Sequence, residues 1–258
     1  MMGIEMNQKE ELIRKRIIDL ASKSFQNNMF TFTNFLSESE LSDFHQMKDK
    51  LNVSVYQIFG GYELAERAMI RFGSIEELGY EEKFPIACIK IEPLIEKFAD
   101  SFSHRDFLGA VMNLGIERDQ IGDIVIEGKS AYLFTIEKMS SFICQNLDQV
   151  KHTHMKCAIV EEVLTSNGRQ TKLEEVSVSS ERIDAVVAKI YHISRNESIN
   201  LFRTQKVFIN GKTIENNSYL LREEDKISVR GFGKFIYKKV VYISKKGKLN
   251  IQIERFIS

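Results

Sequence analysis

Between residues 80 and 165, strand-like and helix-like segments alternate in an order that limits the chain to few folds. Apolar residues repeat with the period of a strand in four segments and with the period of a helix in two. The strands are predicted near 84–91, 121–127, 130–136 and 156–163, and the helices near 103–114 and 139–147. This β-α-β-β-α-β order is typical of the ferredoxin-like arrangement, which RNA-recognition (RRM) domains share. Because the sequence lacks the aromatic stacking signature of those domains, the order predicts the fold rather than the activity.

The first 78 residues are predicted to be helical. Residues 10–25 have apolar side chains at helical spacing. Ser37 and Glu40 have the spacing of a capping box, in which each side chain bonds the backbone N–H of the other residue at a helix start. Gly60-Gly61 predicts a tight loop that enters a further helix, which would reach Phe72.

The C-terminal residues are predicted to combine two helices with a small antiparallel sheet. Residues 183–190 contain one apolar stripe, which predicts an amphipathic helix. Ser194 and Glu197 form a second capping box, so another helix is expected to start there. Strands are predicted over 206–212, which ends in an Asn-Gly turn, and over 225–230, which a basic segment follows.

Together these segments predict an α+β protein with three domains. We expect a helical N-terminal domain over 1–78, a ferredoxin-like domain over 79–165, a polar linker over 166–180 and a C-terminal domain over 181–258. Within the linker, Asn167-Gly168 is a strong turn signal whose flanks would pair as a short hairpin. The length of 258 residues suits two or three domains of ordinary size.

Composition excludes several classes of protein. Hydrophobic residues make up 43% of the chain and charged residues 28%, which suits a globular protein with a sizeable core. No segment approaches the roughly 18 apolar residues that a membrane helix requires, and the N-terminal residues lack the apolar core of a secretion signal. Three scattered cysteines do not suggest a disulfide framework. We therefore expect a soluble cytoplasmic protein that does not contact membranes.

Charge is distributed unequally along a chain whose formal net charge is +0. Residues 181–258 contain 16 Lys and Arg against 8 Asp and Glu. The remaining residues contain 20 basic and 28 acidic side chains, out of 36 of each sign in the whole chain. A basic C-terminal segment attached to an acidic remainder predicts that the C-terminal domain binds a polyanion.

The predicted helix start and cationic side chains of this basic segment suit RNA. A capped helix at Ser194 would present backbone N–H groups and a positive dipole end to a phosphate, with Arg195 in its first turn. Arginine binds phosphate through two parallel hydrogen bonds or stacks on a base. Gly231 would let the backbone approach RNA closely. Such a surface reads RNA shape rather than sequence. The candidate RNA-binding residues are Arg182, Lys189, Ser194, Arg195, Arg203, Lys206, Asn210, Lys212, Arg230, Gly231 and Lys234.

The same segment resembles a known RNA-binding module, the S4 domain. The resemblance covers residues 180–235 and includes Arg182 with Asp184, Ser194-Arg195, Asn210-Gly211 and Gly231. It implies two helices followed by a small antiparallel sheet, with a cationic surface for RNA. Asp184 is expected to orient a neighbouring basic group or to stabilise its helix rather than to touch RNA.

Motifs along the rest of the chain narrow the resemblance to one family. The chain resembles YlmH, a Gram-positive bacterial family described as associated with cell division. The matching segments are 59–68 (FGGYELAERA), 104–110 (HRDFLGA), 115–118 (GIER), 121–123 (IGD) and 228–234 (SVRGFGK). The resemblance implies an RNA-binding protein of the translation apparatus. It further implies contact with the large ribosomal subunit and with tRNA held there, and a role in ribosome-associated quality control.

The sequence offers no recognisable constellation for catalysis, a metal or a cofactor. Many S4 domains precede a pseudouridine synthase domain, but residues 236–258 are too few for one. His152, His154 and Cys157 allow a metal hypothesis, yet a clear fourth ligand is missing, so surface or RNA-facing histidines are the preferred interpretation. We therefore expect a non-enzyme without a cofactor. Two alternatives stay open: an RNA-modifying enzyme with a site in the central domain, and a protein-interaction scaffold in cell division.

Overall fold

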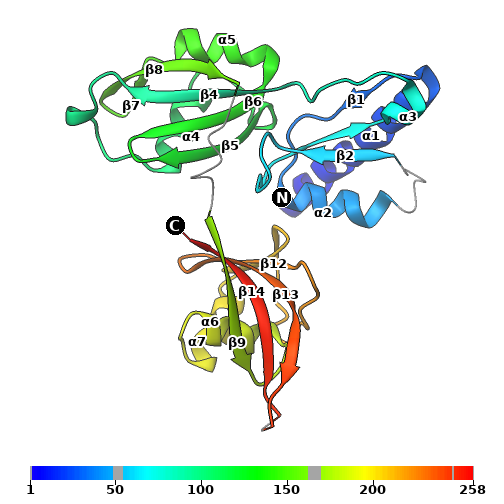
Figure 1. The fold of residues 1–258 in the computed structure, drawn as a ribbon, viewed down its shortest axis with the longest axis vertical. Helices are drawn as coiled ribbons and strands as arrows, with labels where there is room; N and C mark the ends of the chain where they lie inside the picture. The colour runs from blue at the N-terminus through cyan, green and yellow to red at the C-terminus, as the bar shows by residue number, and fades with distance from the viewer. Residues whose placement is uncertain (1, 49–54, 162–169, 246, 258) are drawn as a thin grey trace. The chain divides into compact units, whose positions relative to one another are not determined.

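Two compact units make up the protein in this computed structural model, Met1–Gly168 and Arg169–Ser258 (Figure 1). The structure describes residues 2–48, 55–161, 170–245 and 247–257. Both units combine helices with antiparallel sheets, so the predicted α+β class is confirmed. Among the described residues, no helix is both long and apolar enough to cross a membrane. The predicted turn at Asn167-Gly168 lies outside the described residues.

The first 78 residues contain a sheet as well as helices, so the expectation of a purely helical segment is wrong. Their elements are α1 (Met2–Asn27), β1 (Thr31–Phe32), α2 (Glu38–Met47), β2 (Tyr56–Phe59), β3 (Met69–Phe72) and α3 (Ile75–Leu78). Helix α1 includes the predicted amphipathic segment, and the capping box of Ser37 and Glu40 starts α2 as predicted. The three strands form an antiparallel sheet with the order β1-β3-β2.

Strand β3 replaces the helix that was predicted after the paired glycines. Every residue of β3 is buried, so the strand lacks the polar–apolar alternation by which a half-buried strand is recognised. The glycines do form a tight turn: Gly61 has a φ of 100°, and a Cβ on Gly60 would lie 2.3 Å from the carbonyl oxygen of Arg67. Burial on both faces, rather than local sequence pattern, therefore decided the structure here.

The predicted β-α-β-β-α-β order is present in the central residues. The elements are β4 (Ile86–Pro93), η2 (Glu96–Phe98), α4 (His104–Met112), η3 (Arg118–Gln120), β5 (Ile121–Glu127), β6 (Ser130–Ile136), α5 (Glu137–Asn146), β7 (Gln149–Val150) and β8 (Thr153–Val160). Their strands form one antiparallel sheet with the order β5-β6-β4-β8-β7. Ile89 of this sheet packs in one buried cluster with Phe107 of α4 and Ile143 of α5. Both helices therefore pack against the sheet, as Figure 1 also shows.

Other side chains of the central sheet pack against the N-terminal part of the same unit. Tyr62 stacks on Phe134 of β6 with the ring centroids 5.0 Å apart. The buried carboxylate of Asp123, on β5, accepts a hydrogen bond from the Tyr62 hydroxyl at 2.7 Å. It also accepts from the backbone N–H groups of Glu66 at 2.8 Å and Arg67 at 3.1 Å. Asp123 thus fixes the turn between β2 and β3 on the central sheet.

Two arginines complete this junction through backbone carbonyls. Arg67 donates from Nε to the carbonyl of Ile121 at 2.9 Å and from Nη2 to that of Phe35 at 2.9 Å. Arg118 donates from Nη1 to the carbonyls of Ile121 at 2.7 Å and Gly122 at 3.2 Å. Burial lowers the pKa of both guanidinium groups. The pKa of Arg118 falls to about 10, because the nearby charge of Arg67 adds to the effect of burial. The 1–168 unit is thus joined by polar contacts as well as by packing.

The C-terminal unit consists of two helices and a six-stranded sheet. Its elements are β9 (Gln170–Val178), α6 (Ile183–Ile190), α7 (Arg195–Arg203), β10 (Val207–Ile209), β11 (Lys212–Thr213), β12 (Lys226–Val229), β13 (Gly233–Ile243) and β14 (Leu249–Ile257). Both predicted helices are present, and the capping box of Ser194 and Glu197 starts α7. The strands form an antiparallel sheet with the order β11-β10-β12-β13-β14-β9.

Residues 170–178 form a strand of this sheet, which corrects the linker predicted over 166–180. Strand β9 pairs with β14 along its whole length, from Gln170 opposite Ile257 to Val178 opposite Leu249. The strand was missed because much of it faces solvent: Val178 is buried, whereas Leu173 is exposed. Its many polar residues therefore resembled a connector.

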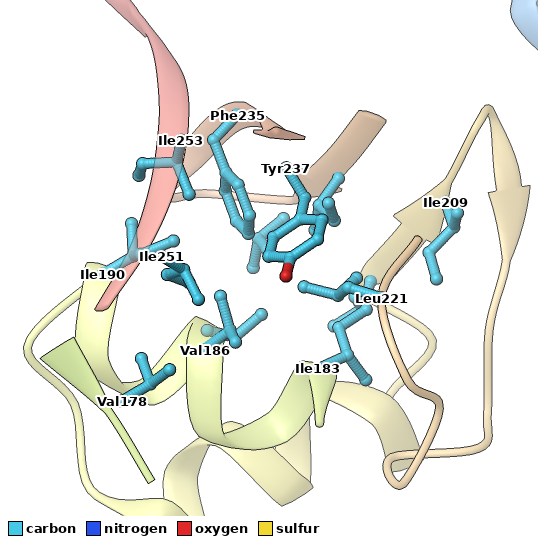
Figure 2. Close-up of a cluster of buried hydrophobic side chains, with 14 of the residues drawn as sticks. Val178, Ile183, Val186, Ile190, Ile209, Leu221, Phe235, Tyr237, Ile251 and Ile253 are labelled. Carbon is cyan, nitrogen blue, oxygen red and sulfur yellow. The ribbon is translucent and has the colours of Figure 1, made fainter. Parts of the chain in front are cut away.

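Helices α6 and α7 pack on one face of this sheet. Val186 and Ile190 of α6 pack with Phe235 and Tyr237 of β13 and Ile251 of β14 in one buried cluster (Figure 2). The apolar stripe predicted for α6 therefore faces the sheet. Lys189 of α6 and Arg195 and Arg203 of α7 are exposed, so a ligand can reach them.

Candidate nucleic-acid interface

A buried carboxylate at the start of α6 holds two of the predicted arginines. Arg182 donates from Nε to Oδ1 of Asp184 at 3.2 Å and from Nη2 to Oδ2 at 3.0 Å. Arg195, the first residue of α7, donates from Nε to Oδ2 at 3.2 Å and from Nη2 to both oxygens at 3.1 Å. Asn217 is the third residue that donates to this carboxylate, from its Nδ2 at 3.3 Å. Asp184 itself is 0% exposed, while the side chains of Arg182 and Arg195 are 40% and 45% exposed.

This arrangement prepares both arginines for an anionic ligand. Two guanidinium groups share one carboxylate, so the cluster keeps a positive charge. Both groups are already oriented before a ligand arrives, which lowers the entropy lost on binding. Asp184 therefore lies where the sequence predicted, as a residue that orients neighbouring basic groups.

The start of α7 offers fewer backbone donors than the sequence predicted. The Oγ of Ser194 accepts a hydrogen bond from the N–H of Glu197 at 3.2 Å, and the Glu197 carboxylate accepts one from the N–H of Ser194 at 2.8 Å. The bond from the Ser194 backbone is the main cause that holds the pKa of Glu197 below its usual range. A carboxylate thus already occupies the helix start, so the side chain of Arg195 is the feature here that suits a phosphate.

Three further predicted cations lie where α7 leads into β10. Arg203 ends α7, Lys206 precedes β10, and the backbone N–H of Arg230 donates to the carbonyl of Lys206 at 2.8 Å. The guanidinium of Arg230 lies 5.4 Å from the centre of the Phe208 ring. All three cationic side chains are exposed, and none forms an ion pair with another residue that the structure describes. Their charge is therefore available to a polyanion.

The side chain of Asn210 is engaged within the fold. Asn210 has a φ of 49° in the turn between β10 and β11, where the predicted Asn-Gly turn forms. Its amide donates to Asp225 at 3.1 Å, and its Oδ1 accepts from the backbone N–H of Lys226 at 2.9 Å. These bonds fix the turn that places Lys212 on β11. Asn210 therefore acts as a structural residue in this geometry.

The turn between β12 and β13 offers open backbone and an aromatic ring. Gly231 has a φ of 90°, and no atom lies within 4 Å of the position of an added Cβ. The exposed ring of Phe232 lies 5.4 Å from that of Tyr191, and Lys234 follows on β13. Phe232 was not selected from the sequence, although it stands between Gly231 and Gly233 in a basic segment, a context in which an exposed ring can stack on a base.

The structure brings some of the predicted residues together. Arg182 and Arg195 share Asp184, while Arg203, Lys206 and Arg230 lie at the α7–β10 connection. The remaining predicted cations lie elsewhere: Lys189 on α6, Lys212 on β11 and Lys234 on β13.

The central sheet presents paired charges and an exposed histidine ring. Glu92 of β4 binds Lys90 at 2.7 Å and Lys156 of β8 at 3.0 Å, and these hydrogen bonds hold the pKa of Glu92 below its usual range. Tyr132 of the neighbouring strand β6 is buried, whereas His154 of β8 is exposed. The sheet therefore offers cations that suit phosphates and an imidazole on which a base can stack.

The residues considered for a metal site do not gather. Among the residues that the structure describes, no group of three His, Cys, Asp or Glu side chains is arranged to hold a metal ion. The thiol of Cys157 donates to the carbonyl of Leu147 at 3.4 Å, and burial raises its pKa to about 12. His152 and His154 are exposed. A thiol with a raised pKa is a poor metal ligand, because metals bind the thiolate.

Comparisons with known proteins identify relatives of the chain. A family model described as "Putative RNA-binding domain in YlmH" matches residues 80–163. The "Ribosome-associated protein quality control protein P2" of Bacillus subtilis (strain 168) is 30% identical over 200 residues, which are 76% of this chain and 76% of the relative. The solved structure "Cell division protein ylmH from Streptococcus pneumoniae" has a TM-score of 0.49 and 12% identity, and the match covers 59% of this chain and 91% of that one. The family model thus covers the central sheet rather than the basic C-terminal unit.

Proposed function

The chain belongs to the YlmH family, and we propose that it is an RNA-binding adaptor associated with the ribosome. The observation that carries the proposal is the pair of accessible arginines, Arg182 and Arg195, oriented by the buried Asp184. This pair lies in a segment with 16 basic and 8 acidic residues. Oriented arginines in a basic unit bind the phosphates of folded RNA through charge-assisted hydrogen bonds.

The C-terminal unit is, in this proposal, an S4 domain. Two supports come from its architecture, namely two capped or amphipathic helices and the antiparallel sheet on which they pack. A third support is chemical, since Arg203, Lys206 and Arg230 add charges that are not neutralised by described residues. RNA would bind along the two helix starts and the α7–β10 connection.

The central residues are, in the same proposal, a ferredoxin-like domain that makes a second contact with RNA. The strand order β5-β6-β4-β8, with two helices packed on the sheet, supports the fold. The description of the family model that matches residues 80–163 supports the contact. Lys90 and Lys156 are the cations of the sheet that we assign to it.

The finer assignment follows the family. We propose that the RNA is structured rRNA or tRNA on the large ribosomal subunit, and that the protein works in the cytoplasm in ribosome-associated quality control. The name of the Bacillus subtilis relative supports that role. We propose a non-enzyme. Burial raises the pKa of Cys88 and Cys157 to about 12, which argues against these two thiols as nucleophiles. A scaffold in cell division and an RNA-modifying enzyme are the alternatives.

Co-sedimentation of the full chain with purified large ribosomal subunits tests the proposal. The variant combining Arg195→Gln and Arg203→Gln should bind at least about tenfold more weakly, because two phosphate contacts are lost. The matched control combines Arg14→Gln and Arg16→Gln, two exposed arginines of α1, and should stay within about twofold of the parent.

The other outcomes separate the alternatives. Unchanged co-sedimentation of the Arg195 and Arg203 variant would favour the cell-division scaffold. Chemical modification of RNA by the purified chain with common cofactors, detected by mass spectrometry, would favour the enzyme. Loss of binding with Lys90→Gln and Lys156→Gln alone would place the main contact on the central sheet.

A further inference from the structure

A long stretch of the C-terminal unit contains basic residues and no acidic ones. Residues 226–253 include eight Lys and Arg but neither Asp nor Glu. Lys238 is neutralised by residues that flank the stretch, since it binds Glu224 at 3.1 Å and Glu254 at 3.0 Å. Lys239, Lys245 and Lys248 have no such partner among the residues that the structure describes. Two of these uncompensated charges, Lys245 and Lys248, therefore lie at the end of the β13–β14 hairpin.

The same end of the hairpin exposes three consecutive large apolar side chains. Val241 is 42%, Tyr242 54% and Ile243 66% exposed. Tyr242 and Ile243 follow the register shift after Val240, and as successive residues of a strand they point to opposite faces, so both faces of the hairpin are accessible here. The other end of the hairpin is different, because Phe235 and Ile253 there belong to the buried core. In Figure 1 the hairpin extends past helices α6 and α7.

Hydrogen bonds join the two strands of the hairpin close to this projecting end. Strand pairing continues to Ile243 opposite Leu249. Beyond it, the N–H of Ser244 donates to the carbonyl of Lys248 at 2.8 Å, and the N–H of Lys248 donates to Oγ of Ser244 at 3.0 Å. Gly247 takes the positive φ of 73° that the turn requires. A hairpin held in this way loses little conformational entropy when it binds a partner.

We propose that the end of the β13–β14 hairpin is a second RNA-binding site, at which Tyr242 stacks on a base and Lys245 and Lys248 bind phosphates. Single-stranded or looped RNA presents flat bases next to a charged backbone, which matches an exposed ring between lysines. The register of β13 shifts after Tyr237 and again after Val240. Such irregularities add local twist to the hairpin. This inference rests on the proposed RNA-binding function and adds a contact distinct from the Asp184 cluster.

The test uses the full chain with Tyr242→Ala, Lys245→Gln and Lys248→Gln combined. Binding to ribosomal RNA by filter retention should weaken at least about tenfold, and the slope of log K against log salt should become shallower by about 1.4, or about 0.7 for each phosphate. Tyr242→Phe keeps the ring and should bind like the parent. The matched control, Phe25→Ala with Lys15→Gln and Lys23→Gln, removes one exposed ring and two charges from α1 and should bind within about twofold of the parent.

Each remaining outcome has one meaning. If the hairpin variant binds like the parent while Arg195→Gln with Arg203→Gln is impaired, the hairpin inference is wrong and the proposed function stands. If neither variant is impaired, the hairpin inference is wrong, and the proposed function is wrong as well unless Lys90→Gln with Lys156→Gln abolishes binding. If the hairpin variant keeps its affinity for RNA but no longer binds phosphatidylglycerol vesicles, the end of the hairpin recognises anionic lipid and the RNA inference is overturned. Unchanged circular dichroism and melting temperature show that the variants fold.

Discussion

Asp184 in the C-terminal unit both stabilises the fold and orients side chains at the surface. Asp184 is fully buried, yet its carboxylate receives Arg182, Arg195 and Asn217. Its backbone carbonyl also accepts from the hydroxyl of Ser198 at 2.8 Å. Asp184 thus links the starts of α6 and α7 and orients two accessible cations at once.

Asp184→Asn should separate these two roles. The substitution keeps the size of the side chain but removes the charge shared by Arg182 and Arg195, so the two guanidinium groups would repel each other. We expect the free energy of unfolding to fall by about 1–3 kcal/mol, and RNA affinity to fall by about fivefold because the arginines lose their orientation. Urea titration and filter binding measure the two effects. Unchanged affinity despite the lost stability would mean that the orientation of the arginines is irrelevant to binding.

Tyr191 provides a pH-dependent prediction at the same scale. Burial raises the pKa of its hydroxyl to about 12, against the opposing charge of Arg255. The folded state therefore disfavours the tyrosinate, so this contribution to stability is fully present below the unfolded pKa of about 10 and is lost as the pH rises toward 12. Tyr191→Phe should unfold at a higher pH than the parent in an alkaline titration followed by circular dichroism. If Tyr191→Phe and the parent unfold at the same pH, the raised pKa of Tyr191 does not contribute to stability.

At the scale of elements, the junction of the 1–168 unit depends on a buried carboxylate. Asp123 of β5 accepts hydrogen bonds from Tyr62, Glu66 and Arg67, which all belong to the turn between β2 and β3. This turn precedes strand β3, whose helical prediction was wrong. Strand β3 therefore owes its structure to contacts with residues outside its own segment of the chain.

Asp123→Asn should weaken this junction. The amide cannot accept all three hydrogen bonds, so we expect the free energy of unfolding of the 1–168 unit to fall by about 1–3 kcal/mol. Asp119→Asn is the control, because this exposed carboxylate accepts a hydrogen bond from the side chain of Asn34 at 2.8 Å and is not buried in the junction. It should change stability by less than about 0.5 kcal/mol. Equal losses in the two variants, measured by urea titration, would show that the junction does not depend on Asp123.

At the scale of the whole molecule, each unit has its own hydrophobic core. The cluster around Val186, Phe235 and Ile251 draws only on residues after 170, whereas the other buried clusters draw only on residues before 162. Charge follows the same division, since the basic excess lies within 181–258. An acidic unit and a basic unit with separate cores can therefore differ in stability and in ligand.

Separate cores predict two unfolding transitions in calorimetry. Asp123→Asn should lower the transition of the 1–168 unit alone. Ser194→Ala removes the cap of α7, which costs about 1 kcal/mol, and should lower the other transition alone. A single transition that both variants shift equally would mean that the two units unfold together.

Local patterns in the sequence determined the features whose physics is local. The capping boxes at Ser37 and Ser194, the two strands over 121–127 and 130–136 and the apolar stripe of α6 were all predicted, because each depends on residues within a few positions of one another. The family and the basic character of the C-terminal residues also followed from the sequence, through its motifs and its composition.

Only the tertiary structure decided the features that depend on distant partners. Strands β3 and β9 exist because other strands cover or pair with them, which no local pattern announces. The sharing of Asp184 by Arg182 and Arg195, the capture of Asn210 by Asp225 and the projecting end of β13–β14 likewise depend on where the chain meets itself. The sequence by itself determined which side chains are charged, and the fold decided which of them are oriented, neutralised or left accessible, because hydrogen bonding and burial are set by partners far along the chain.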